Sequence, residues 1–586
     1  MHCLSMVKGV CLLCLVIGLH PESGSSVHSD VSFNQRMAKE MSEGDHMWCQ
    51  PQQVHISYGN STTEVSVMWS TKGPCETGVH YAPHEWNLDL EAVGTHTELD
   101  QSFNATFRFI HRVVLKGLLP LQTYYFRPQV KAGTAAGPFY FKVPAVGNES
   151  GSSSFLVLGN MDSKKMLESV LSEAQSGKYS ALLYGGDLEE ILLSEVEQSD
   201  SEFLSDLEQA AGFVPLMTVP GKKVMTRNLD GLYLYRNTFS MPGTDWPMPS
   251  NKLWYSFDVG QVHFLVYSTD VLFEPDSKNF KAQRDWMVHD LQEANKKRSE
   301  MPWIIAIGSQ PMYCSFGALD ANDCFQNNSK VRHGVEEIFY FFAVDMVFEW
   351  HTAYERMWPK YKGVVITDSY LNPRATIEVI IGSSVGGQNV AAASDVNGTA
   401  PVTADWSAFH LAGPATNGYG RLTVDNSTHL YWEWISSTSR STVDSFWIIQ
   451  ESHGDFNFSN LPHNISHQIK QRIIAMGGKP GTYDFISGSA GSASDGEGWS
   501  EYSLWLGLAV VGAILVIIIG MVAVRSCMRR RRRARAGRRW REVDRDNGAG
   551  GNFYSVASES DTDDNDFEID VYDKTNKQSS KLLTSY

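Results

Sequence analysis

The sequence is short of positive charge. It carries 49 Lys and Arg against 66 Asp and Glu, a formal net charge of −17 over 586 residues. Residues 525–586 hold 14 Lys and Arg against 11 Asp and Glu, which leaves −20 for residues 1–524. Such an acidic chain does not attract nucleic acid or polyphosphate over long range, so nucleic acid is excluded as a partner. The apolar fraction of 42% is that of a globular protein and excludes general disorder.

Charge is absent altogether from residues 504–524. These 21 apolar residues would form about 31 Å of helix at ~1.5 Å per residue, which matches a hydrocarbon core of about 30 Å. A block of arginines follows directly and marks that side as cytoplasmic. Residues 1–26 combine a lysine, an apolar run and small residues, the pattern of a secretory signal. We therefore predict a single-pass type I protein of the cell membrane or an endolysosomal membrane, with its N-terminal bulk outside.

Glycosylation sequons are absent from the tail and cysteines are few. The eight Asn-x-Ser/Thr sites all precede the span: Asn60, Asn104, Asn148, Asn327, Asn397, Asn426, Asn457 and Asn464. This asymmetry agrees with the predicted topology and predicts a glycoprotein. Four cysteines lie between the signal and the span, which predicts two disulfides, Cys49 with Cys75 and Cys314 with Cys324.

The rest of the chain divides into domains by the order of its strand-like and helix-like segments. Alternating runs such as EVSVMWS and FRFIHRVVL, separated by turn residues, predict an all-β domain over residues 27–145. From Phe155, strand-like and helix-like segments alternate in a βαβαβ order, which predicts an α/β domain over residues 150–454. Residues 455–503 read as a short helix and a Gly/Ser stalk, residues 504–524 as the membrane span, and residues 525–586 as a disordered cytoplasmic tail. The tail offers candidate sites for kinases or adaptors at Tyr554, Ser558, Ser560, Tyr572 and Tyr586.

The candidate active site is the stretch VDMVFEWHTAYERMWP, residues 344–359. Its apolar start predicts a buried strand whose C-terminal end opens into a functional loop. The ending Tyr354-Glu355-Arg356 resembles the last metal-binding motif of the purple acid phosphatases, in which a His-x-His pair precedes these residues. Here Trp350 and Thr352 stand at the two histidine positions, with His351 between them.

The resemblance extends over roughly 400 residues. SMPGTDW, PMYCS, YLNPRA, WSAFH and VDSFWIIQESHG are similar to animal-type purple acid phosphatases, and GLLPLQTYYFRPQV resembles the fibronectin type III-like module that precedes their catalytic domain. It implies a calcineurin-like metallophosphoesterase sandwich, preceded by an all-β fibronectin type III-like domain and followed here by the single C-terminal transmembrane helix.

The resemblance also implies which residues stand at the ligand positions of a two-metal centre. Asn160 occupies the carboxylate position of the first motif, and Asp187 keeps the bridging carboxylate of the second, where Glu190 replaces a tyrosine. Lys222, followed by Lys223, stands in the third motif and Ser309 in the fourth. With Trp350 and Thr352 in the fifth, Asp187 is the one expected ligand that remains.

These replacements predict a protein without a metal cofactor or catalytic residues. Lys222 and Lys223 add positive charge where a metal would bind. The electrostatic energy between two unit charges about 4 Å apart is roughly 4 kcal/mol at an effective dielectric of 20, and the repulsion between an ammonium and a dication is about twice that. The leading interpretation is a non-catalytic receptor or binding protein for an unknown extracellular ligand or protein. The alternative is an active acid phosphatase with a rebuilt centre, in which Asp187 and Glu190 hold one or two of Fe, Zn or Mn.

Two further alternatives involve His351. Asp162, Glu189, Glu190 and His351 could form a single-metal site, whereas Ser309 with His351 as a nucleophilic hydrolase lacks any recognised triad context. Without metals, a buried Asp187 needs another positive partner. We therefore expect the ammonium of Lys222 or Lys223 within about 4 Å of a carboxylate of Asp187, Asp162 or Glu190.

Overall fold

The computed structural model describes part of the chain, in two compact units formed by Met1–Thr482 and Tyr483–Tyr586. The described residues are 48–99, 109–129, 136–146, 151–159, 164–186, 188, 191–192, 203–221, 225–226, 229–273, 277–315, 324, 329–351, 353–382, 404–411, 417–437, 439–454, 456, 461–475, 568–572 and 579–583. The predicted signal, stalk and membrane span lie outside them. In the part of the chain described here, no helix is long and apolar enough to cross a bilayer.

The N-terminal domain is the predicted all-β sandwich of two antiparallel sheets. One sheet has the order β1 (Gln52–Tyr58), β2 (Val65–Thr71), β6 (Phe109–Leu115) and β5 (Thr95–Glu98); the other has the order β4 (Leu90–Val93), β3 (Gly78–Ala82), β7 (Thr123–Pro128) and β8 (Phe139–Lys142). All residues of β2 are buried on both faces, and Val65, Val67 and Trp69, which line one face of the strand, belong to the apolar core. The sandwich also meets the following domain, because the Val54 N–H donates to the Glu208 carboxylate at 3.1 Å.

The second domain is built on two larger sheets that pack face to face. The first has the order β11 (Leu216–Thr218), β10 (Tyr179–Tyr184), β9 (Ser153–Leu158), β23 (Gly418–Val424), β24 (His429–Ser436) and β25 (Thr442–Ile449). The second has the order β14 (Tyr255–Val259), β15 (Val262–Tyr267), β16 (Trp303–Gly308), β17 (Met346–His351), β21 (Ile377–Gly382), β18 (Tyr354–Met357) and β22 (Ser407–Leu411). The rings of Phe155 on β9 and Phe264 on β15 lie 4.9 Å apart and join the sheets in one core.

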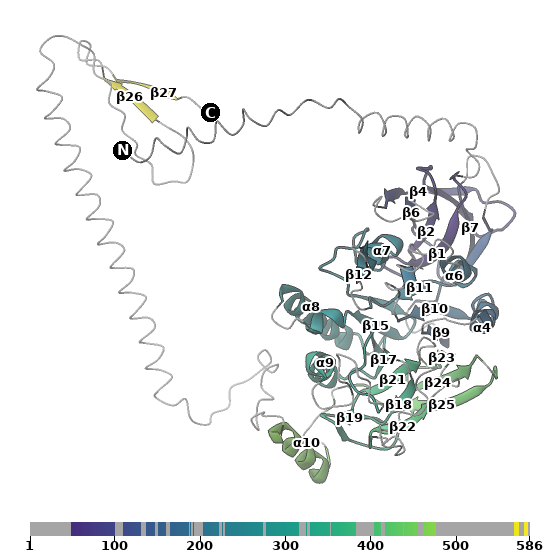
Figure 1. The fold of residues 1–586 in the computed structure, drawn as a ribbon, viewed down its shortest axis with the longest axis vertical. Helices are drawn as coiled ribbons and strands as arrows, with labels where there is room; N and C mark the ends of the chain where they lie inside the picture. The colour runs from purple at the N-terminus through teal and green to yellow at the C-terminus, as the bar shows by residue number, and fades with distance from the viewer. Residues whose placement is uncertain are drawn as a thin grey trace, which may run out of the picture. The chain divides into compact units, whose positions relative to one another are not determined.

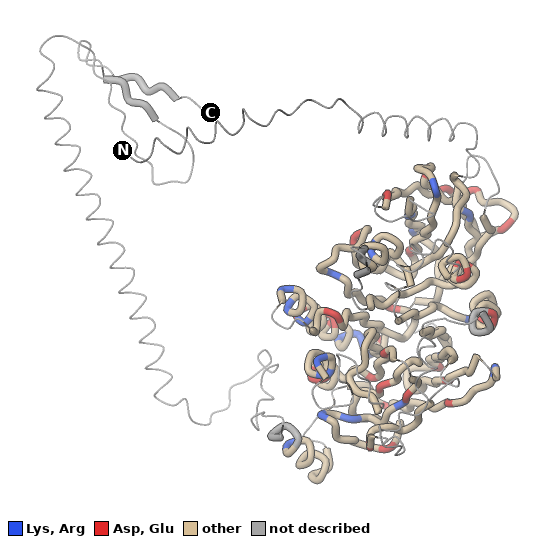
Figure 2. Tube along the Cα trace, in the orientation of Figure 1, with Lys and Arg blue, Asp and Glu red and all other residues tan. Residues whose placement is uncertain are grey.

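Helices cover the outer faces of this sandwich (Figure 1). Helices α4 (Lys164–Ala174) and α6 (Phe203–Ala211) connect the strands of the first sheet, while α8 (Lys278–Lys296) and α9 (Lys330–Phe341) pack on the second. Ser277 and Ser329 cap α8 and α9 by accepting a backbone N–H. The smaller elements are β12 (Met225–Thr226), β13 (Leu229–Asp230), α7 (Gly231–Thr238), η2 (Asp270–Phe273), β19 (Lys360–Tyr361), β20 (Val364–Val365) and α10 (His463–Ala475). Figure 2 shows that the outer helices carry many of the charged residues.

The second unit contains a hairpin that the sequence analysis does not predict. Strands β26 (Glu568–Tyr572) and β27 (Ser579–Leu583) pair antiparallel, within the tail predicted to be disordered. Ile569 and Val571 alternate with charged residues, which is the period of a strand. For these ten residues a composition argument alone overlooked a local pattern, although an isolated hairpin is only marginally stable in water.

Candidate functional site

The strands of both sheets bring the predicted motifs together at their carboxyl ends. In the first sheet β9 and β10 run parallel, with Leu158 opposite Tyr184. In the second sheet β16, β17 and β21 run parallel, with His351 at the end of β17 opposite Gly382. Ligands of open α/β sheets bind beyond such strand ends, so this edge is the candidate site, as the sequence predicts.

The side chain of Trp350 occupies the space between the two sheets at this edge. It is buried, and its indole N–H donates to the carbonyl oxygen of Leu158 at 2.9 Å. A Cβ added to Gly185, just after β10, would lie 2.4 Å from the indole ring, and one added to Gly159, just after β9, would lie 3.4 Å from it. Position 185 therefore requires glycine, because the indole lies directly on the backbone where the first two motifs begin.

Ser309, the fourth-motif residue, is also buried and already has a partner. Its hydroxyl hydrogen-bonds to that of Thr269 at 2.5 Å. The preceding Gly308 is covered by the ring of Tyr267, 2.2 Å from where a Cβ would stand. An indole N–H can only donate a hydrogen bond and a serine hydroxyl is a poor ligand for iron or zinc. The residues at these two positions therefore do not fit a binuclear Fe/Zn centre.

Most other predicted site residues lie outside the described part of the chain: Asn160, Asp162, Asp187, Glu189, Glu190, Lys222, Lys223 and Thr352. The contact between Lys222 or Lys223 and a carboxylate accordingly stays a prediction. His351 is half-buried at the end of β17. Among the residues that the structure describes, no group of three or more His, Cys, Asp and Glu side chains could hold a metal ion.

The opposite face of β17 carries a buried carboxylate network that the sequence analysis missed. Glu349 accepts hydrogen bonds from the Tyr267 hydroxyl at 2.8 Å and the Met312 N–H at 2.9 Å. Glu378 of β21 accepts from the Tyr313 N–H at 2.9 Å and forms an ion pair with Lys360 at 2.7 Å. Burial, reinforced by the nearby Glu378 charge, raises the pKa of Glu349 well above its usual value.

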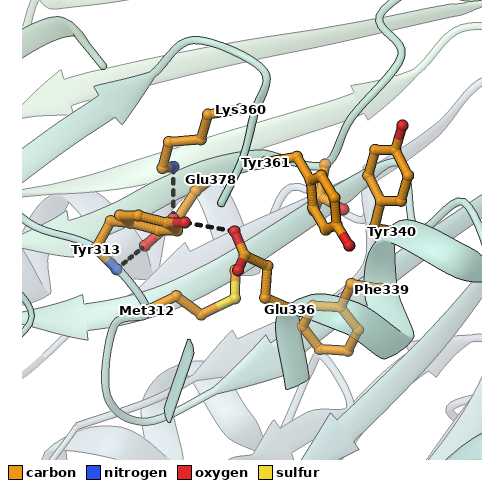
Figure 3. A pocket seen from close by; sticks show the side chains of 9 residues that line it. Met312, Tyr313, Glu336, Phe339, Tyr340, Lys360, Tyr361 and Glu378 are labelled. Atoms are coloured by element: carbon orange, nitrogen blue, oxygen red, sulfur yellow. Dashed lines mark hydrogen bonds and ion pairs between the residues drawn. The ribbon is translucent and has the colours of Figure 1, made fainter. Parts of the chain in front are cut away.

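Figure 3 shows the part of this network formed by Glu378, Lys360 and Tyr313, with Glu336 and Phe339 of α9 beside it. The Lys360 ammonium lies 4.4 Å from the centre of the Tyr313 ring, and the Tyr313 hydroxyl donates to Glu336 of α9. The enclosed cavity is about 10 Å³, room for about one water molecule. The signal in the sequence was a glutamate inside an apolar strand, in VFEW and again in TIEVIIG.

The motif residues that match the family have structural partners. The Arg356 guanidinium donates to both carboxylate oxygens of Asp444, at 2.8 and 2.9 Å, and the Tyr354 hydroxyl donates to the same carboxylate at 2.7 Å. All three residues are buried. Because Arg356 lies on β18 and Asp444 on β25, the contact joins the two sheets of the sandwich.

The disulfides and some sequons also lie in described regions. Cys49 is bonded to Cys75 and Cys314 to Cys324, which confirms the predicted pairs. Three of the eight sequon asparagines are described, Asn60, Asn426 and Asn464, and all three are exposed. Glycosylation itself stays a prediction.

An all-β domain followed by an α/β sandwich, with its motifs at one strand edge, defines a metallophosphoesterase-like protein. Residues 51–143 match the family model "Purple acid Phosphatase, N-terminal domain", and residues 375–445 match "Iron/zinc purple acid phosphatase-like protein C". The chain is 34% identical to acid phosphatase type 7 of Danio rerio over 433 residues (69% of this chain, 92% of the relative). It is 33% identical to that of Homo sapiens over 425 residues (69% and 92%).

The chain belongs to the purple acid phosphatase family. A structure of the purple acid phosphatase PPD1 from yellow lupin (Lupinus luteus) seeds has the same fold, with a TM-score of 0.56 at 21% identity over 68% of this chain and 74% of that one. The family named in these matches uses an iron/zinc centre. The motif resemblance predicts Trp350 and Ser309 at two of its ligand positions.

Proposed function

We propose that this family member has lost metal-dependent catalysis and acts as a non-catalytic surface receptor or binding protein. The observation that supports this most strongly is the position of Trp350. Its indole lies between the ends of β9, β10 and β17, against Gly185 and Gly159, at a position where the family carries a metal-binding histidine. A ring in that place takes up volume that metal ions and a phosphate would need.

The chemistry of the neighbouring ligand positions supports the same proposal. Ser309 has no charge to offer and its hydroxyl is bonded to Thr269. Lys222 would place an ammonium at a ligand position, and its repulsion from a dication is worth several kcal/mol at an effective dielectric of 20. Asn160 and Thr352 are neutral. No cofactor is therefore expected.

The proposed setting is the outer or lumenal face of a membrane. A signal at residues 1–26, a span at residues 504–524 and sequons only before the span together describe a type I glycoprotein of the cell membrane or an endolysosomal membrane. Its partner would be an extracellular or lumenal protein or ligand. A glycosidase that leaves the mobility of the chain unchanged, or antibody access to the tail on intact cells, would refute this topology.

The decisive test measures metal and activity together. Full-length protein should contain no stoichiometric Fe, Zn or Mn and should hydrolyse aryl phosphates no faster than buffer between pH 4 and 8. Human acid phosphatase type 7, purified in parallel, is the positive control. A metal-dependent rate that Asp187→Ala abolishes would reject the proposal.

Such a result would establish the alternative, an active acid phosphatase with a rebuilt metal centre on Asp187 and Glu190. Two observations favour this second candidate. Asp187 stands at the bridging carboxylate position. The relatives from Danio rerio and Homo sapiens, at 34% and 33% identity, are named acid phosphatases.

A further inference from the structure

One end of the N-terminal sandwich exposes four large apolar side chains. Trp86 is 84% exposed and Leu90 43%, in and after the turn between β3 and β4; Leu119 is 63% and Leu121 62% exposed, in the turn between β6 and β7. These turns lie at the same end, because β3 and β7 run antiparallel with Ala82 opposite Tyr125. We call these four side chains the apolar tip.

The backbone at Leu121 is in a conformation that leucine disfavours. Its φ is +64°, and the Gln122 N–H donates to the Leu119 carbonyl at 3.3 Å to close the turn. Proline followed by a residue of positive φ is the pattern of a type II turn, in which glycine is favoured at this position. An exposed leucine there costs conformational free energy and gains little from burial. Hydrogen bonds within the chain hold the turn itself: the Leu121 N–H donates to the Val143 carbonyl oxygen at 2.9 Å, and the Leu119 N–H donates to the Tyr124 hydroxyl at 3.2 Å. These contacts explain the backbone of the turn but not the choice of an exposed leucine side chain at this position.

The charge around the apolar tip limits what can dock there. Residues 83–91, which form the first turn and the start of β4, contain three acidic residues, Glu85, Asp89 and Glu91, and no Lys or Arg. At the same end of the sheet Lys142 is exposed opposite Thr123. Glu85 and Asp89 lie on either side of Trp86 in the sequence, and both are exposed. Lys116, at the start of the second turn, lies 4.0 Å from Glu64. An acidic rim is repelled by anionic lipid headgroups and attracts Lys and Arg, so a basic protein surface fits better than a membrane.

The second turn of the tip lies beside the turn between β1 and β2, because the Leu118 N–H donates to the Thr63 carbonyl oxygen at 3.0 Å. In that neighbouring turn, Asn60 accepts from the Gly243 N–H of the second domain at 3.2 Å. This end of the sandwich therefore lies near the second domain, and the four side chains of the tip are exposed there. Strand β4 also ends its sheet, and no strand among the described residues pairs with its outer edge.

We propose that the apolar tip is the docking surface for a protein partner whose apolar face is rimmed by Lys and Arg. The inference rests on the proposed function as a binding protein and assigns its binding surface. Exposed Trp and Leu side chains would supply the apolar contact, and Glu85 and Asp89 would pair with the basic rim. The strain at Leu121 would then be the cost of presenting an anchor side chain.

The test uses full-length protein in phosphatidylcholine nanodiscs, immobilised for biolayer interferometry. The probe is a helical peptide with leucines on one face and lysines on the other, compared with the same peptide carrying glutamates for lysines. Trp86→Ser and Leu121→Gly remove parts of the tip. Trp447→Ser is the matched control, because Trp447 on β25 is 46% exposed and lies in the other domain.

We expect the lysine peptide to bind about tenfold more tightly than the glutamate peptide, and each tip variant to weaken that binding about fivefold or more. Trp447→Ser should bind as wild type does. Leu121→Gly should leave the Tm unchanged or raise it, which separates lost binding from lost folding.

Three results would overturn the inference. The first is equal binding of the two peptides, or tip variants that bind like wild type. The second is binding of phosphatidylserine vesicles that Trp86→Ser abolishes, which assigns the tip to lipid. The third is a concentration-dependent dimer that the same variant dissolves, which assigns it to a second copy. Metal content and aryl phosphate hydrolysis, measured on the same preparation, test the proposed function separately. If the protein is an active enzyme and still binds through the tip, the proposed loss of catalysis is rejected and the docking surface is not.

Discussion

The two halves of residues 344–359 differ in how they use the family motif. In the second half, Tyr354 and Arg356 match the motif, and both bond to the buried carboxylate of Asp444. In the first half, Trp350 stands where the motif predicts a histidine and fills the strand edge, while the neighbouring Glu349 enters a buried carboxylate network. Tyr354 and Arg356, which match the motif, join the two sheets, whereas Trp350 lies at the strand edge of the candidate site. The matching residues therefore serve the fold, and the proposed loss of catalysis would leave them unaffected.

The largest expected effect comes from removing the Arg356–Asp444 ion pair, in the half of residues 344–359 that matches the family motif. Arg356→Met should reduce the free energy of unfolding by roughly 3–5 kcal/mol, because it leaves Asp444 buried without its cation. Chemical denaturation measures this. Arg440→Met is the matched control, since Arg440 and Glu168 form a pair with side chains 62% and 57% exposed, and such surface pairs contribute about 0–1 kcal/mol. Equal losses of unfolding free energy for the two variants would show that the Arg356–Asp444 contact does not stabilise the packing of the two sheets.

A smaller effect should follow from restoring a family residue in the changed half. Trp350→His removes part of the indole volume and its hydrogen bond to Leu158, which should cost about 2 kcal/mol of unfolding free energy. Under the proposed function it should restore neither metal content nor hydrolysis, because the motifs also predict replaced residues at the other ligand positions. Trp447→His is the exposed control and should change stability by less than about 0.5 kcal/mol. Iron or zinc binding by the Trp350→His protein alone would mean that the indole was the single obstacle.

The sequence allowed most of the fold to be predicted, because its signals are local. The apolar runs FLVLG and WIIAIG form β9 and β16, and the hairpin of β14 and β15 turns at Gly260, where φ is +60°. Order along the chain fixed the parallel strands, since a βαβ connection places neighbouring strands side by side. The hairpin in the tail was not predicted, because the prediction used the polar composition of the tail and not the local alternation of apolar and charged residues.

The candidate site could be predicted only in outline. Motif spacing placed Trp350 and Ser309 at the strand edge, but spacing alone cannot show that an indole lies on Gly185. The network of Glu349, Glu378 and Lys360 joins residues from three separate strands. Such pairings depend on tertiary packing. A glutamate in an apolar strand indicates only that some partner must exist.

The buried carboxylates also make stability depend on pH. Burial raises the pKa of Glu349 and of Glu355, so the folded state holds protons that the unfolded state has lost. Burial alone would lower the pKa of His263, but its hydrogen bonds to Asp258 and Asp290 raise it to about 9. A raised pKa gives stability that is lost as pH rises through the folded value.

We therefore expect the free energy of unfolding to fall between pH 6.5 and 8.5, by about 1.4 kcal/mol per pH unit for each proton released. The window starts at pH 6.5 because buried His55 and His111, whose pKa values are lowered by burial, oppose the trend below it. Urea denaturation at a series of pH values measures the slope. A stability that rises across this window would contradict the assignment.

The smallest expected effect tests whether Glu349 contributes to this pH dependence of the unfolding free energy. Glu349→Gln replaces a carboxyl that should already hold a proton, so near pH 6.5 the variant should differ from wild type by less than about 1 kcal/mol. As pH rises, wild type loses the stability linked to this proton and the variant does not, so the difference should shift in favour of the variant by pH 8.5. Glu293→Gln, at an exposed pair with Lys296, is the control and should show no such shift. A constant difference between Glu349→Gln and wild type across the window would mean that Glu349 is ionised throughout and holds no proton in the folded state.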